Sequence, residues 1–217
     1  MAQHSDRARE ALMNAAEELF AQHGIAAVSN RKIAEHAGTA NHSAVAYHFG
    51  TRDELFRALV LRHFEVMSVR RDQLFAELGP EPTTHDIVRC RLMPLIEQLD
   101  SLPKPSWRAQ FLMQAHSKPD ASPIIKEALL RDEETLQTLS MKMPVSNISE
   151  SVMRARSGLI ANLVLGVCAQ YEAEVNTGIE RGSWTSVGYF LIDAAAGMLS
   201  APVTHAGGVP RAAPTYI

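Results

Sequence analysis

The fold is decided by one stretch near the N-terminus, residues 29–54, which reads SNRKIAEHAGTANHSAVAYHFGTRDE. Ser29 can cap a short helix over residues 30–37, because its side chain can accept a hydrogen bond from a free backbone N–H. Gly38 can end that helix, since glycine readily adopts the positive φ that follows a helix end. A tight turn and a second short helix over residues 41–48 are predicted next. Two short helices joined in this way form a helix-turn-helix, whose second helix can enter the major groove of DNA.

The residues on either side of this motif also predict helices. Upstream, residues 6–23 place apolar side chains three and four positions apart, so that one face can pack against the motif. Downstream, Thr51 and Glu54 have the spacing of a capping box, so a fourth helix is predicted to begin there. Its pattern continues to Leu78, and at ~1.5 Å per residue such a helix spans about 40 Å, enough to pass from one domain into another.

The remainder of the chain is also predicted to be helical. We expect helices over residues 84–101, 106–117, 122–141, 149–177 and 183–200, with Pro94 kinking or breaking the first of them. No segment alternates regularly enough to predict a β-strand. The predicted fold is therefore all-α. It has an N-terminal three-helix DNA-binding domain (residues 1–51), a C-terminal helical domain (residues 52–201) and a flexible tail (residues 202–217).

The composition excludes several classes of protein. Of the 217 residues, 46% are apolar and 21% are charged, which is typical of a globular chain and not of a disordered one. The net charge of -3 excludes a globally basic DNA binder, although residues 28–52 contain three basic residues and one acidic residue. The longest run without Asp, Glu, Lys, Arg or His, residues 157–171, is shorter than the roughly 20 residues that a membrane helix needs. We expect a cytoplasmic protein with no membrane partner, no metal and no cofactor.

Short polar side chains at the start of the second helix fit a role in reading DNA. Asn41, His42 and Ser43 lie there, and Asn and Ser side chains can hydrogen-bond to base edges. Tyr47, one turn later, can offer its hydroxyl group to the phosphate backbone. The pattern taken alone fits a helical corner without DNA contacts equally well.

Residues 7–67 resemble the DNA-binding domain of TetR-type (tetracycline-repressor-like) transcriptional regulators. The resemblance is carried by ALMNAAEELFAQHGIAAVSNRKIAEHAG (residues 11–38) and AVAYHFGTRDELFRALV (residues 44–60), which includes the segment Tyr47-His48-Phe49 typical of the family. Two departures are a segment 39–46 that is one residue longer than usual and Arg52 in place of the more frequent Lys. The resemblance implies the following DNA contacts: Arg31, Asn41, His42, Ser43, Tyr47, His48 and Arg52.

The same resemblance gives the C-terminal half a role. The apolar helices 149–177 and 183–200 could form an ordinary core, but in the resembled family the last two helices pair with those of a second subunit. We therefore expect a homodimer, with an interface formed by Val152, Leu159, Leu163, Val167, Val187, Phe190, Leu191 and Ala194. The resemblance also implies a ligand pocket within residues 85–175. Its candidate lining residues, each more often a core residue when taken alone, are Cys90, Met93, Trp107, Gln110, Phe111, Gln114, Leu163 and Tyr171.

The function implied by the resemblance is that of a ligand-responsive regulator that binds a palindromic operator in double-stranded DNA as a dimer. Most members of the family are repressors, and an apolar or amphipathic effector would release the DNA. A ligand-independent or activating regulator is one alternative. An enzyme is another alternative, with His116 near Cys90, or the acidic run 132–134, as candidate catalytic groups. No nucleophile motif or phosphate loop supports it. We therefore expect the protein not to be an enzyme.

Overall fold

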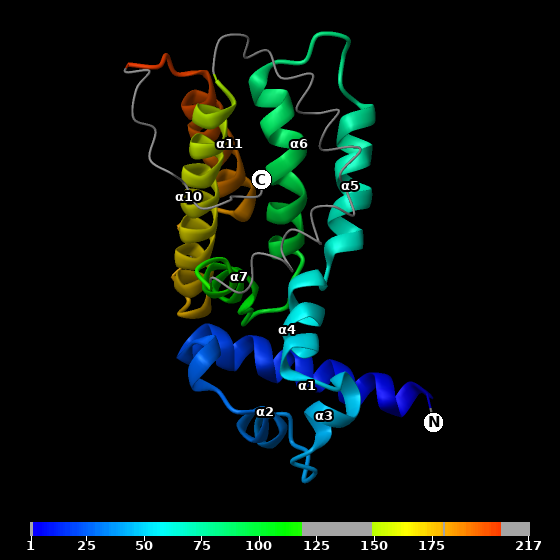
Figure 1. Cartoon of the computed structure of the whole chain (residues 1–217). Coiled ribbons are helices and arrows are strands. Elements are labelled where there is room, and N and C mark those ends of the chain that lie inside the picture. The colour runs from blue at the N-terminus through cyan, green and yellow to red at the C-terminus, as the bar shows by residue number, and fades with distance from the viewer. Residues whose placement is uncertain (1, 119–148, 180, 205–217) are drawn as a thin grey trace.

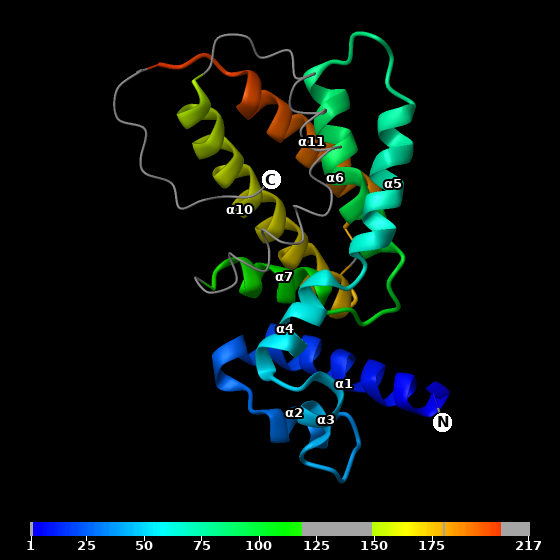
Figure 2. The ribbon, with the colours of Figure 1, turned by 45° about the vertical axis from the view of Figure 1, so that its right-hand side comes forward.

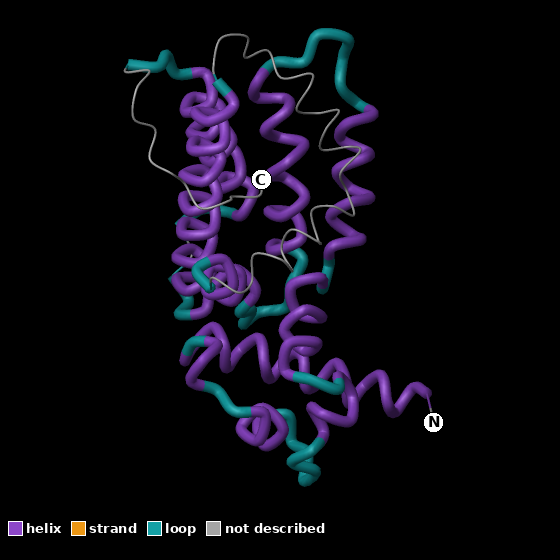
Figure 3. Tube along the Cα trace, in the orientation of Figure 1, coloured by secondary structure: helices purple, strands orange, loops and turns teal. Residues whose placement is uncertain are grey.

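The computed structural model describes residues 2–118, 149–179 and 181–204, and every regular element within these ranges is a helix (Figures 1 and 3). Four helices form the lower part, here called the head: α1 (Ala2–His23), α2 (Asn30–His36), α3 (Ala44–Phe49) and α4 (Arg52–Leu61). A short 3-10 turn, Ile25–Ala27, joins α1 to α2. The upper part, here called the body, contains α5 (Phe64–Ala76), α6 (Thr84–Asp100), α7 (Arg108–His116), α10 (Glu150–Asn176) and α11 (Trp184–Ser200). The all-α fold predicted from the sequence is confirmed.

The core of the head includes side chains from the body. Its buried residues come from all four head helices and include Leu12, Phe20, Ile33, Val45, Leu55 and Leu59. Phe111 and Ala115 of α7 belong to the same cluster. The Phe111 ring lies 6.2 Å from the Phe20 ring and 6.0 Å from the Phe56 ring, measured between centroids. The helix α7 is therefore the part of the body that packs into the head, and Figure 1 shows it between the two parts.

The core of the body is built around α6. This helix lies between α5 and α11, while α10 packs against α7 and crosses α11 (Figure 2). A Cβ atom built on Gly188 of α11 would lie 3.0 Å from Ile96 and 3.1 Å from Met93, so the absence of a side chain there lets α11 approach α6 closely. Thr83 and Asp86 form a complete capping box at the start of α6. Pro94 lies inside α6, and the helix continues through it.

The predicted helices of the body are confirmed where the structure describes them. The predictions 84–101, 106–117, 149–177 and 183–200 match α6, α7, α10 and α11 within two residues at each end. The predicted helix 122–141 lies outside the described residues. By length and composition alone, residues 151–176 of α10 could also cross a membrane, a property that the core helix of a globular protein can share.

The predicted single helix from Thr51 to Leu78 is wrong. The helix α4 ends at Leu61, and α5 begins at Phe64 after His63, which has a φ of 68°. The physical reason is a distant side chain. The Arg108 guanidinium donates hydrogen bonds to the carbonyl oxygens of Leu59, Val60 and Arg62 at 2.6, 3.2 and 2.9 Å. These carbonyl groups no longer need N–H groups from a following helical turn, so the helix can end there without leaving them unpaired.

Candidate DNA-binding interface

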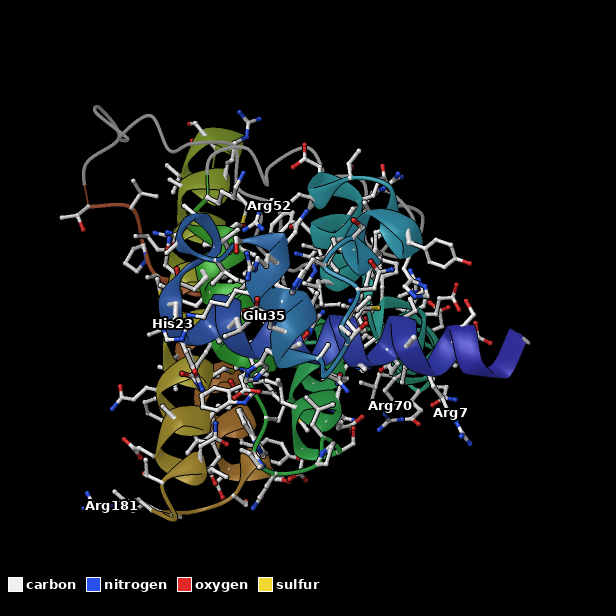
Figure 4. All side chains as sticks on the ribbon, turned by 90° about the horizontal axis from the view of Figure 1, so that it is seen from below. Arg7, His23, Glu35, Arg52, Arg70 and Arg181 are labelled. Carbon is white, nitrogen blue, oxygen red and sulfur yellow. The ribbon has the colours of Figure 1, made fainter. Side chains whose placement is uncertain are left out.

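The helix-turn-helix is held by local caps and by a buried inner face. The Ser29 side chain accepts a hydrogen bond from Lys32 N, as the sequence predicted. Ile33, Ala34 and Val45 are buried against α1 and α4. Gly38 has a φ of +73°, a conformation that residues with a Cβ atom rarely adopt. The outer face of the motif is left to solvent, and Figure 4 views the molecule from this side.

The turn between the two short helices is longer than the sequence suggested. The helix α3 begins at Ala44 and not at residue 41, so Asn41, His42 and Ser43 precede it as exposed turn residues. The Asn41 side-chain oxygen accepts a hydrogen bond from Ser43 N at 3.0 Å, and Thr39 accepts one from Asn41 N at 3.2 Å. Such Asx turns compete with helix formation, which explains the late start of α3. The Asn41 amide nitrogen remains the donor that this side chain can offer to a base.

The aromatic pair at the end of α3 presents one ring to solvent. Tyr47 is 79% exposed, an unusual position for a large aromatic side chain. The His48 ring packs edge-on against it, with 4.9 Å between the centroids. Phe49 lies under the guanidinium of Arg9 at 4.8 Å from the ring centroid. Phe49 thus anchors the end of α3, while Tyr47 projects from it into solvent.

An acidic residue lies among the candidate DNA contacts. Glu35 of α2 accepts a hydrogen bond from Arg31 Nε at 2.7 Å, and His42 Nδ1 lies 3.9 Å from the same carboxylate. The hydrogen bond from Arg31, together with its charge and that of His42, lowers the pKa of Glu35. Glu35 is near the centre of the view in Figure 4. The Glu35 carboxylate is therefore already bound to the Arg31 guanidinium, which the resemblance assigns to a DNA contact. The sequence alone did not indicate that Glu35 and DNA compete for Arg31.

Arg52 differs from its predicted role. It is half-buried, donates hydrogen bonds to the Ile25 carbonyl oxygen and to Asn30 Oδ1, and lies over the Phe20 ring at 5.1 Å. Burial lowers the pKa of its guanidinium. These contacts join the start of α4 to the start of α2, so Arg52 fixes the position of the motif. Both terminal nitrogens of its guanidinium are thus engaged within the chain, and the direct phosphate contact that the resemblance implied stays a prediction.

The candidate pocket residues divide between the two cores. Phe111 is fully buried in the head core, so it is not available to line a pocket in the body. Cys90 and Met93 are buried in the body core, and Gln114 is exposed at the end of α7. Tyr171 donates a hydrogen bond to the Gly182 carbonyl oxygen at 3.0 Å and packs edge-on against Trp184. The remaining candidates are partly exposed: Trp107 just before α7, Gln110 on α7 and Leu163 on α10.

The candidate interface residues also differ in how exposed their side chains are. Leu159 of α10 and Phe190 of α11 are 60% and 64% exposed, and their neighbour Tyr189, which the sequence analysis did not select, is 53% exposed. Leu191 is fully buried in the core of its own chain and has no surface left for a partner. The other candidates are partly buried: Val152, Leu163, Val167, Val187 and Ala194.

Two buried charged residues that the sequence analysis missed connect α10 to the head. Glu172 of α10 is 1% exposed and accepts hydrogen bonds from the backbone N–H groups of Ala109 and Gln110 at the start of α7. Arg108 of α7 is equally buried and pairs with Glu17 of α1 at 3.2 Å. Burial raises the pKa of Glu17, an effect that Arg108 and Arg62 oppose. No sequence pattern marks these residues, because they are buried only by packing against helices that are distant in the sequence.

The head of the molecule matches a known protein family. Residues 12–59, which contain the whole helix-turn-helix, match the family model described as "Bacterial regulatory proteins, tetR family". Among solved structures, the chain is similar to a candidate transcriptional regulator from Streptomyces coelicolor A3(2), with 17% identity and a TM-score of 0.45 over 90% of this chain and 99% of that one. It is also similar to RolR in complex with its ligand resorcinol, with 18% identity and a TM-score of 0.44 over 94% and 99%. No curated protein matches the chain. The family match shows that residues 12–59 are a DNA-binding domain of the tetR family of bacterial regulatory proteins, whose members are transcriptional regulators.

Proposed function

We propose that this protein is a cytoplasmic, ligand-controlled transcriptional repressor that binds a palindromic operator as a homodimer and leaves it when a small molecule binds the body. The observation that carries the proposal is the shared packing of head and body at α7. Phe111 lies in the head core, and Arg108 holds the carbonyl groups at the end of α4. Glu172 holds the opposite side of the same helix start from α10. A ligand or a partner that moves α7 or α10 would therefore move the head.

The dimer is supported by the unpartnered apolar side chains of α10 and α11. Leu159, Tyr189 and Phe190 are more than half exposed, and burying apolar surface gains about 25 cal/mol per Å². Two adjacent apolar helices that pair with two copies of themselves form a four-helix bundle. The helix α10, which is apolar enough to suit a membrane by composition, would then be covered by protein. We propose this interface without Leu191.

Two heads are also what operator binding requires. Helix-turn-helix dimers contact half-sites about 34–36 Å apart, or a multiple of that distance, along the duplex. A single head offers few cations, so doubling the phosphate contacts is needed for useful affinity. We propose Asn41, His42 and Ser43 as base-edge contacts, and Tyr47 with His48 and Arg31 as backbone contacts. Arg52 then acts by positioning α2.

The packing also suggests where the DNA-binding domain ends and where the effector binds. The domain boundaries 1–51, 52–201 and 202–217 remain predictions. Because Leu55, Phe56, Leu59 and Val60 of α4 are buried in the head core, the packing favours a first boundary near residue 61. The body would hold the effector beside α6, α7 and α10, where Met93, Trp107, Gln110 and Leu163 remain candidates.

The proposal can be tested with the full chain and a duplex taken from upstream of its own coding region. We expect binding to a palindrome in that duplex, one dimer per palindrome, and a dimer in sedimentation of the free protein. Reporter expression should rise when the gene is deleted. A stable monomer at micromolar concentration would contradict the dimer, and lower reporter expression in the deletion would identify an activator.

A further inference from the structure

The helix α7 begins without a capping side chain of its own. Trp107 precedes the helix and makes no capping hydrogen bond, and the first backbone N–H groups of any helix lack partners within that helix. Glu172 of α10 supplies the missing acceptors. One carboxylate oxygen accepts hydrogen bonds from Ala109 N at 3.1 Å and Ser106 Oγ at 2.7 Å, and the other accepts one from Gln110 N at 2.9 Å. The start of α7 is therefore capped by a residue 63 positions after Ala109.

Asn176 of α10 holds the peptide just before this cap. It lies one turn after Glu172, on the same face of the helix. Its side-chain oxygen accepts a hydrogen bond from Ser106 N at 3.2 Å, and its side-chain nitrogen donates one to Ser106 O at 2.7 Å. Figure 2 shows this end of α10 beside α7. Together these five residues form a unit, here called the α10–α7 clamp: Ser106, Ala109, Gln110, Glu172 and Asn176.

The residue inside the clamp also holds the head. The guanidinium of Arg108 donates hydrogen bonds to the carbonyl oxygens of Leu59 and Arg62 at the end of α4. It also pairs with Glu17 of α1 at 3.2 Å. The backbone around Arg108 is thus fixed to α10, while its buried side chain is fixed to α4 and α1. A shift of the end of α10 therefore reaches the head through groups that are buried and hydrogen-bonded at each step.

We propose that Glu172 is a positioning residue for DNA binding. Through the α10–α7 clamp it fixes the orientation of the head relative to α10, and thereby the separation of the two heads in the dimer. The inference rests on the proposed function, because the second head belongs to the proposed dimer, and it names the side chain by which the dimer helix sets the spacing of the heads. A local cap without this role would stabilise α7 and leave the orientation of the head unchanged.

The test variant is Glu172→Gln. It keeps the size of the side chain but replaces one acceptor oxygen by an NH2 group, which meets a donor of the clamp. The full-length protein is titrated with the palindrome from upstream of its coding region and with duplexes lengthened between the half-sites by one and by two base pairs. Each added base pair moves one half-site by about 3.4 Å and rotates it by roughly 35°.

The expected result is a loss of spacing preference. The wild type should prefer the natural spacing, and the ratio of its affinities for natural and lengthened duplexes should fall roughly tenfold in Glu172→Gln, because a hydrogen bond to a charged group is worth about that factor. A general loss of stability would weaken binding to all spacings by the same factor, and that result would overturn the inference.

The matched control is Glu174→Gln. Glu174 lies on the same helix, about 160° around it from Glu172, and its carboxylate accepts a hydrogen bond from Gln170 outside the clamp. This variant makes the same change of charge and should keep the spacing preference of the wild type. If Glu172→Gln does not fold, Ser106→Ala removes one hydrogen bond of the clamp and should change the preference in the same direction by less.

A second measurement needs no DNA. Amide hydrogen exchange of the free protein should become faster in Glu172→Gln both at the start of α7 and at the end of α4 near Leu59, and in Glu174→Gln at neither. Faster exchange confined to the start of α7 would make Glu172 a local cap and would overturn the inference.

The possible results separate this inference from the proposed function. If the wild type binds the palindrome as a dimer and Glu172→Gln keeps its spacing preference, the proposed function stands and the positioning role falls. If the wild type shows no dimer or no preferred spacing, the proposed dimer falls. Hydrogen exchange at the end of α4 then decides alone whether Glu172 joins α10 to the head.

Discussion

Arg108 Nη1 donates a hydrogen bond to the carbonyl oxygen of Leu59 at 2.6 Å, across 49 residues of sequence. The bond joins the first residue of α7 to the last turn of α4 and thus connects the body to the head. Its guanidinium also pairs with Glu17 of α1. One fully buried side chain of α7 therefore contacts the two longest helices of the head, α1 and α4.

Replacing Arg108 by Met should destabilise the protein strongly. The change removes the closest ion partner of the buried Glu17 carboxylate, which keeps only Arg62 at 3.8 Å. It also removes the side-chain donor of three carbonyl groups, of which Leu59 keeps the N–H of Arg62. We expect a loss of about 3–5 kcal/mol in the free energy of unfolding. Urea unfolding measures this. Arg108→Met combined with Glu17→Leu should recover part of the loss, because no unpaired charge then remains. A double variant that is no more stable than the single one would contradict the coupling.

His63, which lies between α4 and α5, should make stability depend on pH. Burial, with the charges of Arg108 and Arg62, lowers its pKa from 6.5 to about 4. Between these pH values the unfolded chain binds a proton on the imidazole that the folded chain does not bind. The free energy of unfolding should therefore fall as the pH is lowered from 6.5 toward 4. His63→Asn, which tolerates the positive φ and does not titrate, should show a smaller fall in the same window. Identical pH profiles would exclude His63 as the cause.

Removing Glu35 should strengthen DNA binding. Glu35→Gln frees Arg31 and removes a negative charge near His42, so one more cation per head can meet a phosphate. The slope of log affinity against log salt should steepen by about 0.9 per head. Glu77→Gln, which removes the same charge far from the head, is the control and should leave the slope unchanged. Weaker binding by Glu35→Gln would show that Glu35 positions Arg31 for DNA.

Tyr47 and Arg52 should respond differently to substitution. Tyr47 is exposed, so Tyr47→Phe should weaken binding to all duplexes by about 0.5–1.5 kcal/mol with no change in thermal midpoint. Arg52→Ala should lower the midpoint, because the Ile25 carbonyl and Asn30 lose their donor. Thermal unfolding and DNA titration at two salt concentrations separate the effects. A stable Arg52→Ala protein with a reduced salt slope would restore the direct phosphate contact.

Charge placed on the α10 and α11 surface should prevent dimer formation. Phe190→Arg and Leu159→Arg would bury an unpaired cation in the proposed interface, and sedimentation should show monomers. Val66→Arg on α5 makes the same change at a side chain that is 65% exposed outside this surface, so it should remain dimeric. Equal sedimentation of all three variants would place the interface elsewhere.

The sequence by itself determined where most helices begin. The side chains of Ser29, Thr51, Thr83, Ser149 and Ser183 each accept a hydrogen bond from a backbone N–H three residues later. Such bonds lie within one helical turn, so adjacent residues encode them and a pattern can reveal them. The helix-turn-helix and its family were readable for the same reason.

Only the tertiary structure decided which polar side chains became buried and where α4 ended. Arg108 contacts the end of α4 from 46 residues beyond Arg62, and Arg52 turns inward onto Ile25. Gln98 lies inside the body with no hydrogen-bond partner among the described residues. Leu191 packs inward while the adjacent Phe190 stays in solvent. The cost of burying a charge or an amide depends on which distant groups meet it, and that is fixed only when the helices pack together.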